Sequence, residues 1–241
     1  MKISQNDLDV VILAGGRGTR LSSVVSDRPK PLADINGKPF LFWLLSYLEK
    51  QGIRRVILSL GHMADLIEDY FLKNSMAKLE LIFSKESEPL GTGGGLRQAL
   101  SKINSEEVLV LNGDSFCLFS VDDLVKNFSQ FKAQMVMGLI ETLDCGRYGS
   151  VVINNKKQVT QFLEKSALVQ GGLINAGVYL LKRSLIEQIP HDQAVSLERD
   201  IFPKYVGKGF YGIEIKSVFI DIGTPESLIL AREMFGQGKF G

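Results

Sequence analysis

The strongest constraint on this 241-residue chain is a basic, glycine-rich segment that directly follows a short apolar run. Val10–Leu13 has the length and composition of a buried strand. Ala14–Leu21, which reads AGGRGTRL, follows it, and Lys30 comes next between two prolines. Glycines allow backbone N–H groups to approach a phosphate closely, and the arginines and the lysine add positive charge. The pattern predicts a loop that binds phosphate groups.

Two common phosphate motifs do not describe this loop. A dinucleotide fingerprint, G-x-G-x-x-G, would need glycine at position 21, where Leu21 stands. A P-loop that ends in Gly37-Lys38 would need glycine at position 32, where Leu32 stands. The segment is therefore a phosphate loop of another kind, with more cationic side chains than either motif.

The composition excludes several classes of protein. Apolar residues make up 45% and charged residues 23%, and 28 Lys+Arg against 27 Asp+Glu give a formal net charge of +1. Nucleic-acid and membrane-surface proteins carry a basic excess, so we expect neither partner. The sequence has no apolar run near 18 residues, and its polar first residues do not resemble a signal peptide. Cys117 and Cys145 form no metal or disulfide pattern, so we expect a cytoplasmic protein.

Apolar runs and amphipathic segments alternate along the first half of the chain. The expected strands are Val10–Leu13, Val56–Leu60, Leu79–Phe83, Val108–Leu111 and Met135–Ile140. Helical spacing marks residues 40–48, 64–71 and 95–103 between them. This order predicts an α/β fold with a mostly parallel sheet. Shorter strand-like runs follow after residue 134, at 150–153, 159–163 and 178–181, and no linker divides the chain, so we expect a single domain over residues 1–241.

The signature at the phosphate loop resembles that of a known family. Leu13–Leu21 followed by Pro29–Pro31 is similar to the pattern L-A-G-G-x-G-T-R-L and P-K-P of the sugar-phosphate nucleotidylyltransferases. Later motifs occur in the family's order, so the resemblance spans roughly residues 8–235. It implies a Rossmann-like three-layer sandwich with a mostly parallel mixed sheet. It also implies a nucleotide-binding part, about residues 8–134, and a sugar-binding part, about residues 135–235.

The resemblance implies a reaction and the residues that carry it. A sugar 1-phosphate attacks the α-phosphorus of a nucleoside triphosphate, and pyrophosphate leaves. Arg20 would neutralise the pyrophosphate, Lys30 would stabilise charge at the α-phosphate, and Asp114 would hold the metal. The residues expected at the nucleotide are Leu13, Ala14, Gly15, Gly16, Gly18, Thr19, Glu86, Glu88, Gly91, Thr92, Asn112 and Gly113.

A second glycine-rich segment carries the candidates for base recognition. Four glycines stand within Gly91–Gly95, ahead of the helix expected from Gly95, and two glutamates precede them. In the family this segment lies against the base, so Glu86 or Glu88 is suited to read it. A carboxylate only accepts hydrogen bonds, and guanine offers two adjacent donors, whereas uracil and thymine offer one. The residues favour guanine and leave open which glutamate is used.

Two aspartates stand at strand ends and suggest a magnesium site. Asp114 follows Val108–Leu111, and Asp221 ends the apolar run that begins at Phe219. Mg²⁺ takes oxygen ligands, commonly one or two carboxylates with substrate phosphates and water. In the family the aspartates that match these two hold the metal. Thr224 and Pro225 read as the start of a helix, which does not account for Asp221.

The resemblance assigns the acceptor sugar phosphate to the second half of the chain. Lys165 would pair with the phosphate, Glu164 would bind sugar hydroxyl groups, and Asn175 would add an amide. Gly149 and Gly177 belong to the same expected site. On residue type alone, Glu164 and Lys165 are an ordinary exposed pair, and only the order of the motifs singles them out.

Within the family, Ser22–Lys30 and Glu88–Gly94 look most like the guanylyltransferases of D-glycero-D-manno-heptose 1-phosphate, which serve surface polysaccharide synthesis such as lipopolysaccharide or capsule. The alternatives are mannose 1-phosphate guanylyltransferases and glucose 1-phosphate uridylyl-, thymidylyl- or cytidylyltransferases. A non-catalytic nucleotide-sugar sensor is the alternative outside the enzymes. The chain lacks the C-terminal extension of bifunctional members, which implies one activity. The sequence leaves a homo-oligomer open.

Overall fold

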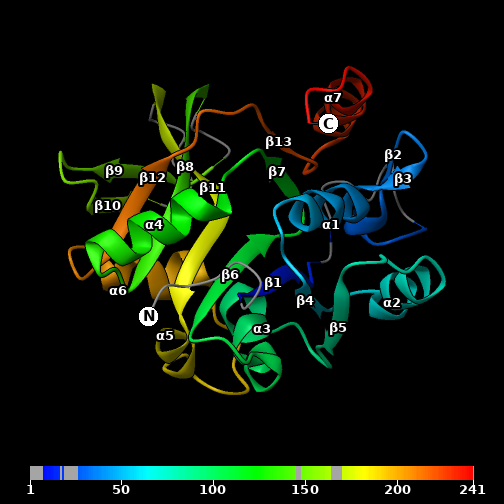
Figure 1. The fold of residues 1–241 in the computed structure, drawn as a ribbon, viewed down its shortest axis with the longest axis horizontal. Coiled ribbons are helices and arrows are strands. Elements are labelled where there is room, and N and C mark those ends of the chain that lie inside the picture. The colour runs from blue at the N-terminus through cyan, green and yellow to red at the C-terminus, as the bar shows by residue number, and fades with distance from the viewer. Residues whose placement is uncertain (1–7, 17, 19–26, 145–147, 164–169, 241) are drawn as a thin grey trace.

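A mixed β-sheet forms the centre of the computed structural model, which describes residues 8–16, 18, 27–144, 148–163 and 170–240 (Figure 1). In this part of the chain the sheet has nine strands. Seven follow the order β10-β9-β11-β6-β1-β4-β5, and β8 and β12 extend from β11. The parallel strands at one end are β1 (Asp9–Ala14), β4 (Arg55–Leu60), β5 (Glu80–Lys85) and β6 (Glu107–Asn112).

Antiparallel pairing joins the second half of the chain to this parallel core. Strand β11 runs antiparallel to β6, with Val178 opposite Leu111, and it also pairs with β8 and β9. Strand β12 pairs parallel to β8. The strands of this half are β8 (Met135–Asp144), β9 (Ser150–Ile153), β10 (Val159–Leu163), β11 (Gln170–Lys182) and β12 (Phe210–Glu214). The expected mostly parallel, mixed sheet is confirmed.

Helices cover both faces of the sheet. Side chains of a strand alternate between its two faces, so a strand that is apolar throughout has two apolar faces to bury. Val10 and Ile12 of β1 belong to one buried cluster and Val11 to another. The first cluster includes residues of α1 (Phe40–Lys50), α2 (Ala64–Lys73), α4 (Val121–Phe131) and α7 (Pro225–Gly236). The second includes residues of α3 (Gly91–Ala99), α5 (Arg183–Glu187) and α6 (Phe202–Tyr205). The expected three layers are present.

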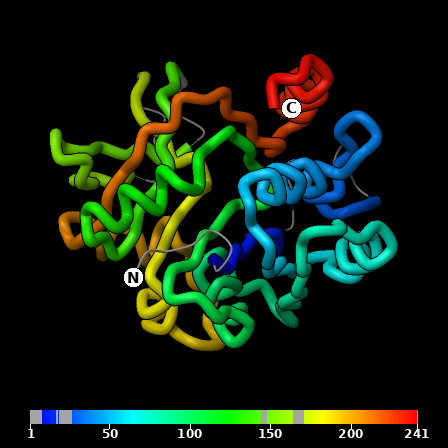
Figure 2. The backbone as a smooth tube through the Cα atoms, in the orientation of Figure 1, coloured from blue at the N-terminus to red at the C-terminus, as the bar shows by residue number. Residues whose placement is uncertain are grey.

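The remaining elements lie outside the nine-stranded sheet. The C-terminal helix α7 returns to the N-terminal half, where Arg232 Nε donates to the carbonyl of Asp34 at 3.0 Å (Figure 2). Strand β13 pairs antiparallel with β7, with Asp221 opposite Ser115. The bounds are η2 (Lys30–Leu32), β2 (Asp34–Ile35), β3 (Lys38–Pro39), η3 (Leu100–Lys102), β7 (Ser115–Cys117), η4 (Leu197–Ile201) and β13 (Phe219–Asp221).

Two elements differ most from the sequence prediction, α3 and β11. The helix expected at residues 95–103 begins instead at Gly91 and ends at Ala99, so the glycine-rich segment is its first turns rather than a loop before it. The amides of Gly93 and Gly94 donate to the carbonyl of Val195, at 2.8 and 3.2 Å, which holds these glycines in place. Strand β11 is also longer than the run at 178–181 and includes Gly171 and Gly172.

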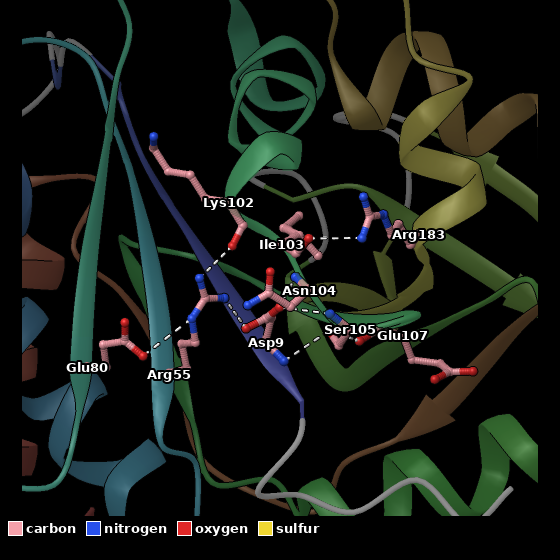
Figure 3. Close-up of polar contacts among 9 residues, drawn as sticks. All are labelled: Asp9, Arg55, Glu80, Lys102, Ile103, Asn104, Ser105, Glu107 and Arg183. Atoms are coloured by element: carbon pink, nitrogen blue, oxygen red, sulfur yellow. Dashed lines mark hydrogen bonds and ion pairs between the residues drawn. The ribbon is translucent and has the colours of Figure 1, made fainter.

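An ionic cluster ties the strands together at their amino ends, opposite the edge where ligands bind in such sheets (Figure 3). The side chain of Asp9 is buried and accepts hydrogen bonds from the Arg55 guanidinium and from the amide of Ser105. Arg55 also donates to the carbonyl of Lys102 at 2.8 Å and pairs with Glu80. The cluster joins β1, β4, β5 and the turn before β6, which indicates a structural role.

None of the helices in the described residues is long and apolar enough to cross a membrane.

Candidate active site

A cavity of about 390 Å³ opens at the carboxyl ends of the parallel strands. This is the edge where open α/β sheets bind ligands, and the volume is within the range of small-molecule sites. The predicted residues that line it are Leu13, Ala14, Gly15, Gly16, Gly18, Lys30, Glu86, Gly91, Thr92, Asn112, Gly113 and Asp114. The structure therefore brings most of the predicted nucleotide site together around one cavity.

Lys30 and Asp114 form an ion pair at this cavity. The Nζ atom of Lys30 lies 2.6 Å from Oδ2 of Asp114. The lysine side chain is 11% exposed and the aspartate 44%, so the cation is sheltered and the carboxylate faces the cavity. Prolines on both sides fix the backbone of Lys30 at the start of η2, and Gly18, with φ of 62°, packs over its stem. A fixed, desolvated cation of this kind suits a developing phosphate charge.

Backbone contacts from three segments hold Asp114. The amide of Gly113 donates to the carbonyl of Leu13 at 2.9 Å, and the amide of Ile222 donates to the carbonyl of Asp114 at 2.9 Å. A Cβ atom on Gly113 would lie 2.9 Å from the Leu13 carbonyl oxygen, so only glycine allows this approach. The carboxyl end of β1, the turn after β6 and the residue after β13 thus meet at one point.

Hydrogen bonds fix the carboxylate of Glu86 at another side of the cavity. Its Oε2 accepts from the amide of Leu90 at 3.0 Å, and its Oε1 accepts from the hydroxyl of Ser59 at 3.5 Å. Cβ atoms on Gly15 and Gly95 would fall 2.9 and 2.4 Å from Oε1, so both glycines leave space for the carboxylate. Burial raises the pKa of Glu86, against hydrogen bonds that lower it.

The other predicted residues of this segment are placed differently. Glu88 is exposed and is not among the residues that line the cavity. Thr92 lines the cavity, but its hydroxyl donates to Glu198 at 2.7 Å and accepts from the amide of Leu197 at 2.8 Å. The Thr92 side chain therefore ties α3 to η4. Of the two glutamates that the sequence left open, Glu86 is the one at the cavity.

Asp221 lies beside the cavity, on the strand that pairs with β7. Its Oδ1 accepts from the amide of Gly223, which lines the cavity, at 2.6 Å. Its Oδ2 accepts from the hydroxyl of Tyr148. The neighbouring Ile222 donates a hydrogen bond to the carbonyl of Asp114, so both aspartates stand at adjoining strand ends.

In the described part of the chain no three His, Cys, Asp or Glu side chains gather as a metal site. Two carboxylates at adjoining strand ends fit Mg²⁺, which completes its shell with phosphate and water.

The predicted sugar-phosphate residues lie outside the cavity lining. The side-chain amide of Asn175 donates through Nδ2 to the hydroxyl of Tyr179 at 2.8 Å, and its Oδ1 accepts from the backbone amide of Gly177 at 2.8 Å. Gly177, with φ of 71°, packs against Asn112, which lines the cavity. The backbone amide of Asn175 donates to the carbonyl of Gly149 at 3.0 Å. These residues thus form one hydrogen-bonded group behind the cavity wall. Thr19, Arg20, Glu164 and Lys165 lie outside the described residues.

The structure adds residues that no sequence motif indicated. Ser59, at the end of β4, contacts Glu86, and Tyr148 contacts Asp221. Neither stands in a pattern with a chemical meaning, so only their positions in the fold reveal them. Asn112, which was predicted and is the last residue of β6, lines the cavity, and its Oδ1 is buried without a hydrogen-bond partner in the described structure.

Comparison with known proteins decides the family. A family model for nucleotidyl transferases matches residues 9–237. The chain belongs to the nucleotidyl transferase family. It is 39% identical over 220 residues to D-glycero-alpha-D-manno-heptose 1-phosphate guanylyltransferase from Aneurinibacillus thermoaerophilus, covering 91% of this chain and 94% of that protein.

Solved structures agree with this family in fold. The crystal structure of HddC from Yersinia pseudotuberculosis superimposes with a TM-score of 0.85 at 42% identity, covering 95% of this chain and 99% of that one. A structure of the same protein complexed with GMP-PN has a TM-score of 0.84, with the same identity and coverage. The expected nucleotide-diphospho-sugar transferase fold is confirmed, and so is the resemblance drawn from the phosphate loop.

Proposed function

We propose that this protein transfers GMP from GTP to a sugar 1-phosphate, D-glycero-D-manno-heptose 1-phosphate, releasing pyrophosphate and giving a GDP-sugar for surface polysaccharide synthesis in the cytoplasm. The observation that carries the proposal is a sheltered cation and a cavity-facing carboxylate, Lys30 and Asp114, in the cavity that also seats Glu86. The name of the similar Aneurinibacillus thermoaerophilus protein supports the base and the sugar, and the GMP-PN complex of HddC supports the base.

The reaction needs positioning and neutralisation rather than a side-chain nucleophile. An oxygen of the sugar phosphate forms a bond to the α-phosphorus while the bond to the pyrophosphate oxygen breaks. Gly15, Gly16 and Gly18 let the backbone approach the phosphates, and Thr19 belongs to the same proposed cradle. Lys30 stabilises the charge that develops at the α-phosphate. Arg20 neutralises the leaving pyrophosphate in this scheme.

Asp114 and Asp221 would hold Mg²⁺, which when bound neutralises phosphate charge. Glu86 accepts hydrogen bonds from guanine N1–H and the 2-amino group, because it is the glutamate seated at the cavity. Lys165, Glu164, Asn175, Gly149 and Gly177 bind the acceptor sugar phosphate in the proposal.

A substrate matrix tests the proposal. Four nucleoside triphosphates are combined with heptose, mannose and glucose 1-phosphates, and pyrophosphate release is measured. We expect turnover with GTP and the heptose phosphate to exceed every other combination. Turnover restricted to UTP or dTTP would refute the role of Glu86, and the absence of turnover with every pair would favour a nucleotide-sugar sensor.

A further inference from the structure

Tyr148 contacts β13 at two points on one face of the strand. Its ring packs edge-on against Phe219, with centroids 5.3 Å apart and planes at 82°. Its hydroxyl donates to Oδ2 of Asp221. Phe219 and Asp221 are two residues apart and therefore share a face of the strand, while Ile220 between them is buried on the other face. The Phe219 contact locates the ring so that the hydroxyl meets the carboxylate.

The carboxylate of Asp221 is held at both oxygens. Oδ1 accepts from the amide of Gly223 at 2.6 Å, and Oδ2 accepts from Tyr148. The backbone beneath it is fixed, because Asp221 stands opposite Ser115 in the pairing of β13 with β7. A carboxylate has about four lone-pair sites, so a hydrogen bond to each oxygen orients the group and does not by itself exclude a cation.

We propose that Tyr148 is a positioning residue that orients Asp221 for metal binding. The inference rests on the proposed function, in which Asp221 is a metal ligand. Hydrogen-bond donors behind a metal-binding carboxylate fix its direction, and their removal commonly weakens metal binding about 10- to 100-fold. Gly223 supplies one such donor from its backbone N–H, which only a substitution by proline would remove. Tyr148 supplies another from its side chain.

The position of Tyr148 also connects the metal ligand to the sugar-binding half. Tyr148 directly precedes Gly149, whose carbonyl accepts from the amide of Asn175 on β11 at 3.0 Å. A movement of Gly149 or Asn175 would therefore be transmitted to Asp221 through Tyr148. This connection gives the tyrosine a role that a donor within β13 itself would not have.

The variant Tyr148→Phe separates the hydroxyl from the ring. It keeps the ring that contacts Phe219 and removes the hydroxyl that donates to Asp221. The matched control is Tyr205→Phe, since Tyr205 also donates from its hydroxyl, to Gln188 at 3.3 Å, at a site that does not line the cavity. Asp221→Ala serves as the reference for loss of the metal ligand itself.

The measurement is Mn²⁺ binding to each full-length variant with GTP present and the acceptor absent, followed by enhancement of water-proton relaxation. Thermal unfolding of each variant without metal checks that the fold is intact. We expect Tyr148→Phe to raise the Mn²⁺ dissociation constant about 10- to 100-fold, with an unchanged melting temperature, and Tyr205→Phe to bind as the parent does. The Mg²⁺ concentration for half-maximal turnover should rise in parallel.

The outcomes separate this inference from the proposed function. If Asp221→Ala abolishes the bound signal and Tyr148→Phe stays within twofold of the parent, the positioning role is overturned and the metal site stands. Tighter binding by Tyr148→Phe would also overturn it, because the hydroxyl would then be competing with the metal. If Asp221→Ala binds Mn²⁺ like the parent, the metal assignment fails and the inference fails with it.

Discussion

The Nζ atom of Lys30 lies 2.6 Å from Oδ2 of Asp114, although 84 positions separate the two residues in the chain. The fold creates this pair by placing the carboxyl ends of β1 and β6 side by side and by bringing Lys30, the first residue of η2, to the turn after β6. Within this pair each charge neutralises the other. In the proposed reaction a phosphate group would give the lysine a second anionic partner, and Asp114 would then be available to the metal.

Replacing Lys30 tests the cationic half of this pair. We expect Lys30→Ala to lower kcat about 100- to 1,000-fold, the usual effect of removing one preorganised group that stabilises transition-state charge. Stability should change little because Asp114 is 44% exposed and stays hydrated without its partner. Pyrophosphate release under saturating substrates measures the effect. The control is Lys38→Ala, whose ammonium lies 5.0 Å from the ring centroid of Phe42 and outside the cavity. Near-normal turnover of Lys30→Ala would rule out the assigned role.

Substitution of Glu86 tests base recognition. A glutamine keeps one oxygen but turns an amide N–H₂ group toward a guanine donor, which leaves a buried donor unpaired at a cost of about 1–3 kcal/mol. We therefore expect Glu86→Gln to lower kcat/KM for GTP about 10- to 100-fold. ITP lacks the 2-amino group, so kcat/KM for ITP should fall less. The ratio of kcat/KM for GTP to kcat/KM for ITP should therefore decrease.

Glu88→Gln is the matched control for this experiment. Glu88 carries the same charge two residues away, but it is exposed and outside the cavity lining. Its variant should retain the parent's GTP-to-ITP ratio. A narrowed ratio in Glu88→Gln together with a normal ratio in Glu86→Gln would reverse the assignment.

The elements that sequence predicted well are those whose signal is local. Buried strands such as β1 and β4 are short apolar runs, and α1 has apolar residues at helical spacing, so both could be predicted from the chain. The start of α3 could not, because each glycine within a helix costs about 1 kcal/mol. The hydrogen bonds from Gly93 and Gly94 to the Val195 carbonyl, a contact across some 100 positions, override this preference.

The candidate site shows the same division. That Gly15, Gly16 and Asp114 line one cavity could be predicted, because their residue types carry a chemical meaning and they follow strand ends. The choice between Glu86 and Glu88 was not, since both stand in one segment and only the fold buries Glu86. Tyr148 gave no signal, because a tyrosine next to a glycine is ordinary in any sequence.

Asp9 provides a test of the structural cluster at the opposite edge of the sheet. Its carboxylate accepts from Arg55 and from the backbone of Asn104 and Ser105 (Figure 3). Removing one partner of a buried ion pair costs about 3–5 kcal/mol. We expect Asp9→Ala to lower the free energy of unfolding by about 3 kcal/mol, the lower end, because Arg55 is partly exposed and keeps Glu80. Urea denaturation measures the change.

The control for the cluster is Glu80→Gln, whose side chain is 65% exposed. An exposed ion pair contributes less than about 1 kcal/mol, so this variant should unfold like the parent. The KM for GTP of folded Asp9→Ala should match the parent's, since the cluster lies at the amino ends of the strands and the cavity at their carboxyl ends. A large change in KM with unchanged stability would contradict a structural role.

Glu86 should also impose a pH-dependent cost on the folded protein. Burial raises its pKa in the folded state, so the folded protein binds this proton more tightly than the unfolded chain does. The stability from protonated Glu86 is fully present below the unfolded pKa of about 4.3 and is lost as pH rises through the higher folded pKa. Glu86→Gln stays neutral throughout. Its melting temperature relative to the parent should therefore rise between pH 4 and pH 7 in thermal unfolding. If the difference in melting temperature between Glu86→Gln and the parent stays constant over this range, burial does not desolvate the Glu86 carboxylate.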